Sequence, residues 1–355
     1  MISRVAIKNF RSLRDVELSP GPLTVLIGPN GSGKSNLLDA LKFLKAIYSD
    51  PAHSCALMKS QLEDRGGYAQ VIWGGYTDSH LRFEVEFSSD DTNSEHVGFT
   101  TEIAEDPRGM PQLEEERHLV DSVPAGNLGD RSPTTFNISL KARRTLDKLR
   151  SWQFYNFSPD LMRKPTKVKQ EKVLNELGSN LSSVIHSLFS EGHPDLEEAV
   201  GMLQVMVPTV ERLVSPIFGD GQTYVALKEK GIEKPIGAWG LSDGTLLALA
   251  LSVALVVRPE PELICVETPE IGIHPQMMEA VADMLEVASR DTQVIVTTQS
   301  PYLLDWLPYD SFVVVEKKNG ETKLKPLKND DVLRETVAVL GTGPAWYSGY
   351  LGGEP

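Results

Sequence analysis

The stretch that most constrains the fold of this chain is residues 28–35, which read Gly-Pro-Asn-Gly-Ser-Gly-Lys-Ser. The octet fits the pattern G-x-x-x-x-G-K-[ST], in which a glycine-rich turn points consecutive backbone N–H groups at a phosphate. The apolar residues 23–27 before it predict a buried strand, and Leu37, Leu41 and Leu44 after it recur at helical spacing. A strand, a loop and a helix in this order indicate a nucleoside-triphosphate site rather than a chance glycine-rich turn.

The motif also predicts a role for single side chains. Lys34 is expected to reach the β- and γ-phosphates, and the Ser35 hydroxyl is expected to complete the shell of a Mg²⁺ ion. ATP and Mg²⁺ are therefore the expected cofactors. The residues expected to bind ATP in this half of the site are Gly28, Pro29, Asn30, Gly31, Ser32, Gly33, Lys34, Ser35 and Asn36.

Composition narrows the class of protein. The chain has 355 residues, 41% of them hydrophobic, and a formal charge of −14, which argues against coating nucleic acid over the whole surface. Its apolar runs are shorter than the ~20 residues that a membrane span needs, and residues 1–4 already read as a strand rather than a secretory signal. Cys265 lies in an apolar strand, so a disulfide framework is not expected. These features predict a cytoplasmic protein with no membrane partner.

Two further motifs lie in the second half of the chain. Residues 241–245 read Leu-Ser-Asp-Gly-Thr and open an apolar helix. The Ser242 hydroxyl and the backbone N–H groups at Gly244 would then face an anion at the positive end of that helix. The apolar residues 263–266 predict a strand, and it ends in Glu267, an acid placed to orient the water shell of Mg²⁺.

With these motifs in view, the stretch "IKNFRSLRDVELSPGPLTVLIGPNGSGKSNLLDALKFL" resembles the opening of the SMC/RecF-like branch of ABC-type ATPases. The likeness is greatest to the stand-alone predicted ATPases related to the OLD family. Residues 269–275, "PEIGIHP", are similar to the P-E-x-G-[LI]-H-P segment of RecF/OLD-like ATPases, and residues 241–245 resemble the ABC signature. The resemblance covers nearly the whole chain, though only loosely over 49–140.

The resemblance implies an α/β fold, a P-loop NTPase of the ABC-ATPase type. A mixed sheet would be joined by an antiparallel β lobe and a helical subdomain in a single head over residues 1–355. The expected parts are the nucleotide-binding core at 1–48 and 241–355, the antiparallel β lobe with loops at 49–170, and the helical subdomain with connecting strands at 171–240.

In such ATPases the signature motif completes the γ-phosphate site of a partner subunit. The resemblance therefore implies that Ser242 and Gly244 bind the ATP held by a second copy of this chain, in a head-to-tail dimer. Glu267 and Ser35 would hold the metal.

Two positions depart from the family pattern. The acid at the strand end is usually followed by a catalytic glutamate, but here residue 268 is threonine. The next strand usually ends in Thr-His-Ser, but here residue 299 is glutamine. Neither Thr268 nor Gln299 can take up a proton near neutral pH, so slow ATP hydrolysis is expected. The candidate catalytic residues are thus Lys34, Glu267, Thr268 and Gln299. Glu270 is an alternative base if the strand end bends, and His274 reads as an interface or structural residue.

Several parts of the first half carry weaker signals. The resemblance implies that the Asn9-Phe10-Arg11 segment pairs with the nucleotide-binding sheet. Arg11 then either lies near the nucleotide or is an exposed strand-end arginine. Gln70 is the nearby candidate for the Q-loop glutamine of ABC ATPases, with a surface glutamine as the alternative. The pattern predicts a strand at 81–87, loops at 88–95 and 102–116, and a mobile connection at 121–134.

A basic segment follows at 141–172, with ten Lys or Arg against three acids, a charge of +7 by subtraction. Such a segment is a candidate DNA-binding surface or a contact for an acidic partner. Its aromatic residues at 152–157 either form a packed strand, which their near-alternation favours, or stack on bases.

The chain is therefore interpreted as an ATP-dependent, dimerising ATPase with weakened hydrolysis, acting in DNA repair or anti-phage defence. Because the chain ends at Pro355, before any Toprim nuclease domain, a nuclease or toxin effector would act as a separate chain. One alternative is a catalytically silent, nucleotide-sensing scaffold that holds a partner protein. Another is the ATPase subunit of a membrane transporter, which the Asn-Phe-Arg opening and the "PEIGIHP" segment disfavour.

Overall fold

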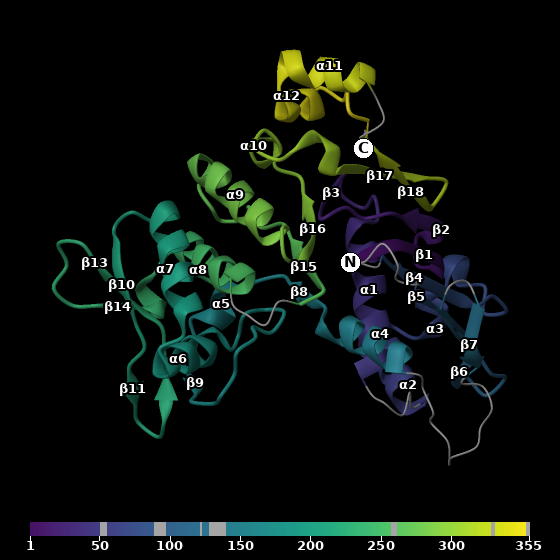
Figure 1. Ribbon diagram of the computed structural model, residues 1–355, viewed down its shortest axis with the longest axis horizontal. Helices are drawn as coiled ribbons and strands as arrows, with labels where there is room; N and C mark the ends of the chain where they lie inside the picture. The colour runs from purple at the N-terminus through teal and green to yellow at the C-terminus, as the bar shows by residue number, and fades with distance from the viewer. Residues whose placement is uncertain are drawn as a thin grey trace. The chain divides into compact units, whose positions relative to one another are not determined.

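The residues that the computed structural model describes are 1–49, 55–88, 97–120, 123–127, 140–256, 261–327 and 331–352. The chain separates into two compact units, each with helices and sheets of its own (Figure 1). The first unit comprises residues 1–152, 310–333 and 351–355, and the second unit comprises residues 153–309 and 334–350.

An antiparallel sheet of six strands forms one layer of the first unit, in the order β2-β1-β4-β5-β6-β7. Three fully buried rings, Phe10 of β1, Phe83 of β4 and Phe43 of α1, have centroids between 5.8 and 6.0 Å apart. Their packing holds α1 against the sheet. The bounds are β1 (Ile2–Phe10), β2 (Leu13–Leu18), β4 (Leu81–Phe87), β5 (Val97–Glu105), β6 (Pro111–Val120), β7 (Val123–Asn127) and α1 (Lys34–Ser49).

The strand that leads into residues 28–35 belongs to a different layer. β3 (Leu23–Ile27) is buried throughout and pairs in parallel with β17 (Phe312–Lys318), which pairs with β18 (Glu321–Pro326) in an antiparallel hairpin. Asn319 (φ 53°) and Gly320 (φ 81°) form the turn of that hairpin, as the Asn-Gly pair predicts. The other helical elements of the first unit are α2 (Cys55–Glu63), α3 (Tyr68–Val71), η1 (Trp73–Gly75) and α4 (Leu140–Ser151).

In the second unit, β16 (Gln293–Thr298), β15 (Leu263–Glu267) and β8 (Gln153–Tyr155) pair in parallel in that order. Helix α9 (Met278–Ala288) packs against β16, and the almost wholly apolar helix α8 (Asp243–Val256) packs against α9 and α7 (Pro194–Met206) (Figure 1). Parallel strands buried in this way bring the carboxyl ends of β15 and β16 to one edge.

The remaining elements of the second unit are helical segments around this core and two small antiparallel sheets. The helices are α5 (Pro159–Met162), α6 (Leu181–Glu191), α7 (Pro194–Met206), η2 (Ala238–Gly240), η3 (Pro275–Met277), α10 (Pro301–Leu304), η4 (Tyr309–Ser311, whose first residue is in this unit) and α12 (Thr342–Tyr347), and α11 (Asp331–Leu340) precedes α12. The strands are β10 (Val210–Val214), β13 (Ala226–Glu229) and β14 (Ile236–Gly237), and β11 (Ile217–Phe218), β12 (Gln222–Thr223) and β9 (Thr166–Lys167).

Three expectations about the first half were wrong. The stretch 102–116 is mostly strand, because β5 and β6 form a hairpin around a turn in which Asp106 Oδ1 accepts from the backbone N–H groups of Arg108 and Met110. Part of 121–134 is strand β7, while 121–122 and 128–134 lie outside the described residues, as do 89–95. The Asn9-Phe10-Arg11 segment ends β1, which pairs with β2 and β4 and is not in the sheet of β3.

Two kinds of feature are absent from the described ranges. Within these ranges no helix has both the length and the apolar character of a membrane span. The same ranges hold no group of three or more His, Cys, Asp or Glu side chains placed to bind a metal ion.

Candidate nucleotide-binding site

Residues 28–35 form a tight turn between β3 and α1 in the first unit. Gly31 (φ 76°) and Gly33 (φ 110°) adopt backbone conformations that favour glycine. A Cβ atom on Gly28 would lie 2.3 Å from the Val315 carbonyl oxygen, and one on Gly33 would lie 2.0 Å from Thr322 Oγ1. A side chain at Gly28 or Gly33 would therefore clash with β17 or β18 and displace the loop.

The loop is supported by a hydrogen-bond network from residues far away in the sequence. Thr322 Oγ1, on β18, donates to the Ser32 carbonyl oxygen at 2.9 Å and lies 2.7 Å from Ser12 Oγ. Asn36 Nδ2, on α1, donates to Ser12 Oγ at 2.7 Å. The turn between β1 and β2 and the β17–β18 hairpin thus brace the loop together.

The polar side chains of the loop fit a phosphate. Lys34 is buried, and its Nζ donates to the carbonyl oxygens of Gly28 at 2.6 Å and Pro29 at 2.9 Å. Ser32 Oγ is buried and has no hydrogen-bond partner among the described residues, so it has a hydroxyl proton to donate. Ser35, the expected Mg²⁺ ligand, is exposed at the start of α1. The Lys34 cation and the Ser32 hydroxyl are thus suited to bind phosphate oxygens, and the exposed Ser35 hydroxyl is suited to bind Mg²⁺.

Replacing Thr322 with valine tests the brace. Valine keeps the shape but removes the hydroxyl, so the Ser32 carbonyl and the Ser12 hydroxyl each lose a buried partner. We expect the free energy of unfolding to fall by about 1–3 kcal/mol, measured by urea denaturation. Thr322→Ser, which keeps the hydroxyl, should remain close to the natural protein. Equal stability of the valine variant would show that the network does not hold the loop.

The second unit carries the acid at the end of β15. Asn156 Nδ2 donates to Glu267 Oε2 at 3.0 Å and so fixes the orientation of this carboxylate. Glu267 and Asn156 also line a cavity of about 200 Å³ whose apolar wall includes Leu247 and Leu251 of α8. Sequence reasoning missed Asn156. The parallel pairing of β8 with β15 sets Tyr155 opposite Val266. The next residues along the two strands, Asn156 and Glu267, therefore lie side by side.

The chain bends sharply directly after Glu267. Thr268 has φ 45°, and the Ile271 N–H donates to the Thr268 carbonyl oxygen at 3.1 Å. Glu270 is thereby brought to the end of β16, where its Oε1 accepts from Thr298 Oγ1 at 2.7 Å and from the Gln299 N–H at 3.2 Å. Glu270, which follows β15, therefore lies beside Thr298 and Gln299 at the end of β16. The alternative in which Glu270 acts as the base requires such a bend after β15.

Residues 241–245 begin α8, and Ser242 acts as its N-cap. Ser242 Oγ accepts from the Thr245 N–H at 3.1 Å, yet the residue is exposed. A Cβ atom on Gly244 would lie 2.5 Å from the Gly272 carbonyl oxygen, so glycine allows the helix start to approach the 269–275 loop. Arg163 forms an ion pair with Asp243 and donates to the Leu241 carbonyl oxygen at 3.1 Å.

Two further predicted residues have structural partners. His274 Nδ1 accepts from the Gln276 N–H at 3.2 Å, which caps η3 and agrees with a structural role. Arg11 pairs with Asp39 of α1 at 3.1 Å. Gln70 is exposed on α3, and its assignment to a Q-loop stays a prediction.

Within the aromatic stretch 152–157, residues Gln153–Tyr155 form a packed strand, β8, as the spacing favours. Trp152 and Tyr155 are buried, and β8 pairs with β15 inside the sheet. Burial raises the pKa of the Tyr155 hydroxyl well above its usual range, so this phenol stays neutral. Stacking of Trp152 or Tyr155 on bases is therefore ruled out.

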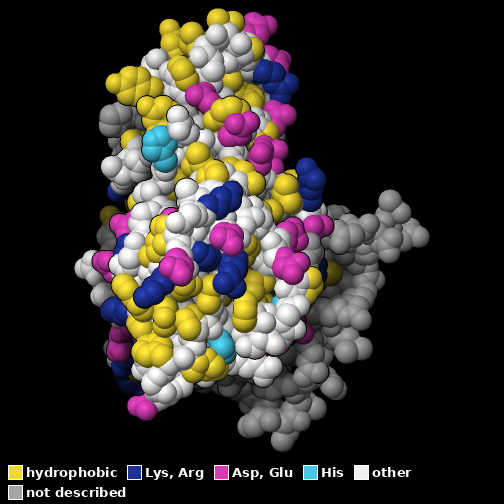
Figure 2. Space-filling view, turned by 90° about the vertical axis from the view of Figure 1, so that its left-hand side faces the viewer, with side chains coloured by type: hydrophobic (Ala, Val, Ile, Leu, Met, Phe, Trp, Pro, Cys, Tyr) yellow, Lys and Arg dark blue, Asp and Glu magenta, His cyan; other side chains and the backbone are white. Residues whose placement is uncertain are grey.

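The basic segment at 141–172 is divided between the two units. Several of its cations have partners within the chain: Arg150 Nε donates to the Tyr48 carbonyl oxygen at 2.9 Å, and Lys172 pairs with Glu191 at 2.8 Å. Lys164, Lys167 and Lys169 are exposed in the second unit. Figure 2, which faces the side with β10, β13 and β14, shows basic side chains interspersed with acidic and hydrophobic ones.

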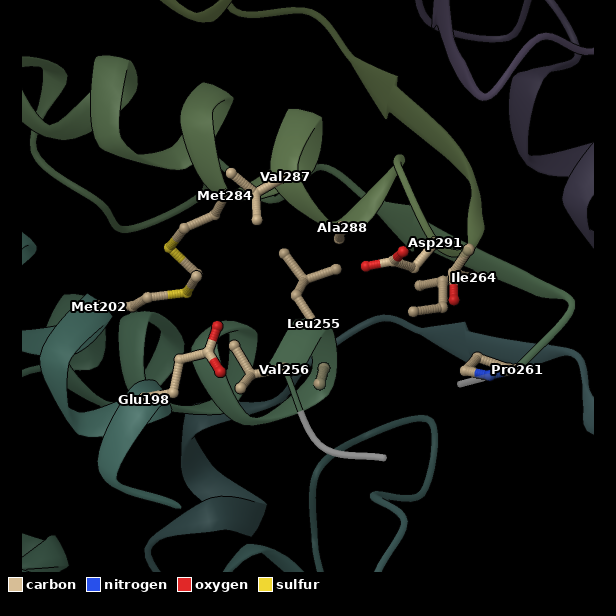
Figure 3. A pocket seen from close by; sticks show the side chains of 12 residues that line it. Glu198, Met202, Leu255, Val256, Pro261, Ile264, Met284, Val287, Ala288 and Asp291 are labelled. Atoms are coloured by element: carbon tan, nitrogen blue, oxygen red, sulfur yellow. The ribbon is translucent and has the colours of Figure 1, made fainter. Parts of the chain in front are cut away.

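A small cavity of about 30 Å³ lies between α7, α8, α9 and β15. Met202 and Met284 point toward each other across it, and the carboxylates of Glu198 and Asp291 face its interior (Figure 3). It has room for a water molecule or two, and none of the motif residues described above lines it. The motif residues, and not this cavity, therefore stay the candidate site.

The model of a protein family described as "AAA domain, putative AbiEii toxin, Type IV TA system" matches residues 23–305. The chain is 22% identical to an OLD nuclease from Thermus scotoductus over 90% of its own length and 63% of that protein's. It is 52% identical over 44 residues to the DNA replication and repair protein RecF from Anaeromyxobacter sp., 12% of each chain. The chain thus spans under two thirds of these relatives.

Solved structures show the same fold. An SMC head bound to the C-winged helix domain of ScpA has a TM-score of 0.63 at 13% identity, with 94% of this chain and 99% of that chain covered. The SMC head domain from Thermotoga maritima has a TM-score of 0.52 at 14% identity, with 92% and 98% covered. Together with the motifs, these matches show that the chain belongs to the AAA-domain family named above and is an SMC/RecF-like ABC-type ATPase related to the OLD family.

Proposed function

We propose that this chain is an ATP-dependent clamp: it binds ATP and Mg²⁺, dimerises on them and hydrolyses ATP slowly. The observation that carries the proposal is the loop at 28–35, in which two glycines admit no side chain and a buried lysine lies on the loop carbonyls. Ser35 and Glu267 would supply the Mg²⁺ ligands. The nucleotide-binding core would comprise residues 1–48 and 241–355, with the β lobe at 49–170 and the helical subdomain at 171–240.

Ser242 and Gly244 would contact the ATP of a second copy. Support comes from the exposed position of Ser242 at the N-terminus of the long apolar helix α8, where the helix dipole favours an anion. Its hydroxyl accepts from the Thr245 N–H and lies 2.8 Å from Thr245 Oγ1. With the threonine hydroxyl as the donor of that pair, the Ser242 proton remains available to a phosphate oxygen.

A charge at Ser242 tests the dimer. Aspartate is also a good N-cap, so Ser242→Asp should leave the unfolding temperature unchanged while its negative charge repels the γ-phosphate. We expect the natural protein to double in mass with Mg²⁺ and a non-hydrolysable ATP analogue in sedimentation analysis, and the aspartate variant to stay monomeric. Ser242→Asn, a neutral N-cap of the same size, should still dimerise. A natural protein that stays monomeric at saturating analogue, or an aspartate variant that dimerises like it, would contradict the proposal.

The proposed setting is DNA repair or anti-phage defence in the cytoplasm, with a separate nuclease or toxin chain as effector. The relatives support the setting: one is an OLD nuclease, one is a DNA replication and repair protein, and one similar head structure has a second protein bound. A catalytically silent scaffold is the second candidate, favoured by Thr268 and Gln299 at the positions of the usual acid and histidine.

DNA binding would use the exposed lysines at 164, 167 and 169. Replacing all three with alanine should weaken DNA binding at low salt. It should also reduce the slope of log affinity against log salt by about 2–3, because each phosphate contact contributes about 0.7–0.9. Fluorescence anisotropy across a salt series measures both. Lys172→Ala, at a lysine paired with Glu191, is the control and should change little. An unchanged slope in the triple variant would exclude this surface.

A further inference from the structure

The turn after β15 places the acidic side chain of Glu270 at the end of the neighbouring strand, β16. Thr268 has φ 45°, a conformation that a β-branched residue rarely adopts. Its N–H donates to the Thr297 carbonyl oxygen at 2.9 Å, and its own carbonyl oxygen accepts from the Ile271 N–H. Because the chain turns here, Glu270 returns to the carboxyl end of the neighbouring strand β16. Parallel α/β sheets bind their ligands at this edge.

The two carboxylate oxygens of Glu270 have different surroundings. Oε1 accepts from Thr298 Oγ1 at 2.7 Å and from the Gln299 N–H at 3.2 Å, and Thr298 is fully buried. Oε2 is buried and has no hydrogen-bond partner among the described residues. A buried carboxylate oxygen without a donor is costly, and in native structures such a group calls for a specific explanation, such as a bound water or a catalytic role.

The neighbours of Glu270 cannot supply a base. Thr268 has a hydroxyl and Gln299 an amide, and neither accepts a proton near neutral pH. Glu267 has its Oε2 engaged by Asn156 and is the expected metal ligand. Glu270 has one oxygen held by two donors and one buried oxygen that has no donor among the described residues. This is the arrangement of a carboxylate that holds a water molecule in a set orientation.

We propose that Glu270 activates the attacking water in ATP hydrolysis, in place of the acid that is missing at position 268. This role rests on the proposed ATPase function. Oε2 accepts a hydrogen bond from the water and takes its proton as the water oxygen bonds to the γ-phosphorus. The bond from that phosphorus to the bridging oxygen breaks, its electron pair leaves with ADP, and the proton then passes to the released phosphate. The Oε1 contacts keep the carboxylate in place throughout.

The substitution Glu270→Gln separates this role from a structural one. Glutamine keeps an oxygen that can accept from Thr298 and Gln299, but it cannot take up a proton. We expect Mg²⁺-dependent phosphate release to fall about 10²-fold, the lower end of general-base effects, with an unchanged KM and unfolding temperature. The double variant Thr268→Glu/Glu270→Gln should regain the lost rate, because the new acid supplies the base. Glu279→Gln, at an exposed acid on α9, is the control.

Each result is decisive. A Glu270→Gln protein that releases phosphate at the natural rate would overturn the role of Glu270 alone. So would loss of rate in both Glu270→Gln and the double variant, since Glu270 would then only brace the end of β16. If the natural protein releases phosphate no faster than Lys34→Ala, ATP hydrolysis itself is refuted, and the role of Glu270 with it. Failure of the proposed ATPase function would thus be seen in the natural protein alone, and failure of the role of Glu270 only in its variants.

Discussion

Replacing Gly33 with alanine should abolish tight ATP binding. The added Cβ atom would lie 2.0 Å from Thr322 Oγ1, and alanine does not readily adopt the φ of 110° found there. The loop must therefore shift, and its backbone N–H groups lose their aim at the phosphates. Each charge-assisted hydrogen bond contributes about 1.5–3 kcal/mol, so the loss of one N–H contact weakens binding about 10- to 150-fold. Titration with a fluorescent ATP analogue measures the change.

Gly31 provides the matched control for this prediction. It also has a positive φ, 76°, but a Cβ atom there would meet nothing within 4 Å. Gly31→Ala should therefore cost only the backbone strain, about 1–2 kcal/mol of folding stability, and should bind ATP nearly as the natural protein does. Equal loss of binding in both variants would mean that strain, and not the contact with Thr322, determines the shape of the loop.

The second large effect is expected at Thr268, where a glutamate should increase the rate of ATP hydrolysis. A carboxylate directly after Glu267 would align the attacking water from the position at which related ATPases carry their catalytic acid. General-base help contributes about 10²–10⁴ in rate. Glu270 is proposed to contribute about 10² of this rate enhancement already. We therefore expect Thr268→Glu to raise the turnover number roughly 10- to 10²-fold. Phosphate release at saturating ATP and Mg²⁺ measures it.

Thr268→Gln is the control that isolates the charge. Both substitutions remove a β-branched residue from φ 45° and relieve the same backbone strain, and the two new side chains have the same length. The glutamine variant should hydrolyse ATP no faster than the natural protein. If both variants are accelerated equally, the relief of strain is responsible and the missing acid is not the cause of slow turnover.

Local sequence patterns predicted the elements that position the site. The strand before residues 28–35, the helix after them and the strand that ends in Glu267 were all correct, because each depends on a contiguous pattern of apolar residues. A packed strand within 152–157 was favoured for the same reason, and β8 (Gln153–Tyr155), with Tyr155 buried, confirms it.

What sequence missed depends on tertiary contacts. Ser12 and Thr322 are polar residues with no local signal, and their bond to each other spans 310 positions. The pairing of β5 with β6 was missed because residues 102–116 are mostly acidic and polar and include Gly and Pro, a composition typical of a loop. The bend at Thr268 was offered only as an alternative, since threonine is among the residues least suited to a positive φ.

In the proposed function, residues 28–35 bind ATP firmly while the residues after β15 and β16 hydrolyse it slowly. The most direct test mixes the natural protein with an equimolar amount of labelled ATP and Mg²⁺ and follows ATP retained and ADP formed over time. We expect the natural protein to retain ATP for many times longer than Thr268→Glu does, and Lys34→Ala to retain none. Conversion of bound ATP as fast as in Thr268→Glu, or equal retention by Lys34→Ala, would contradict the proposed function.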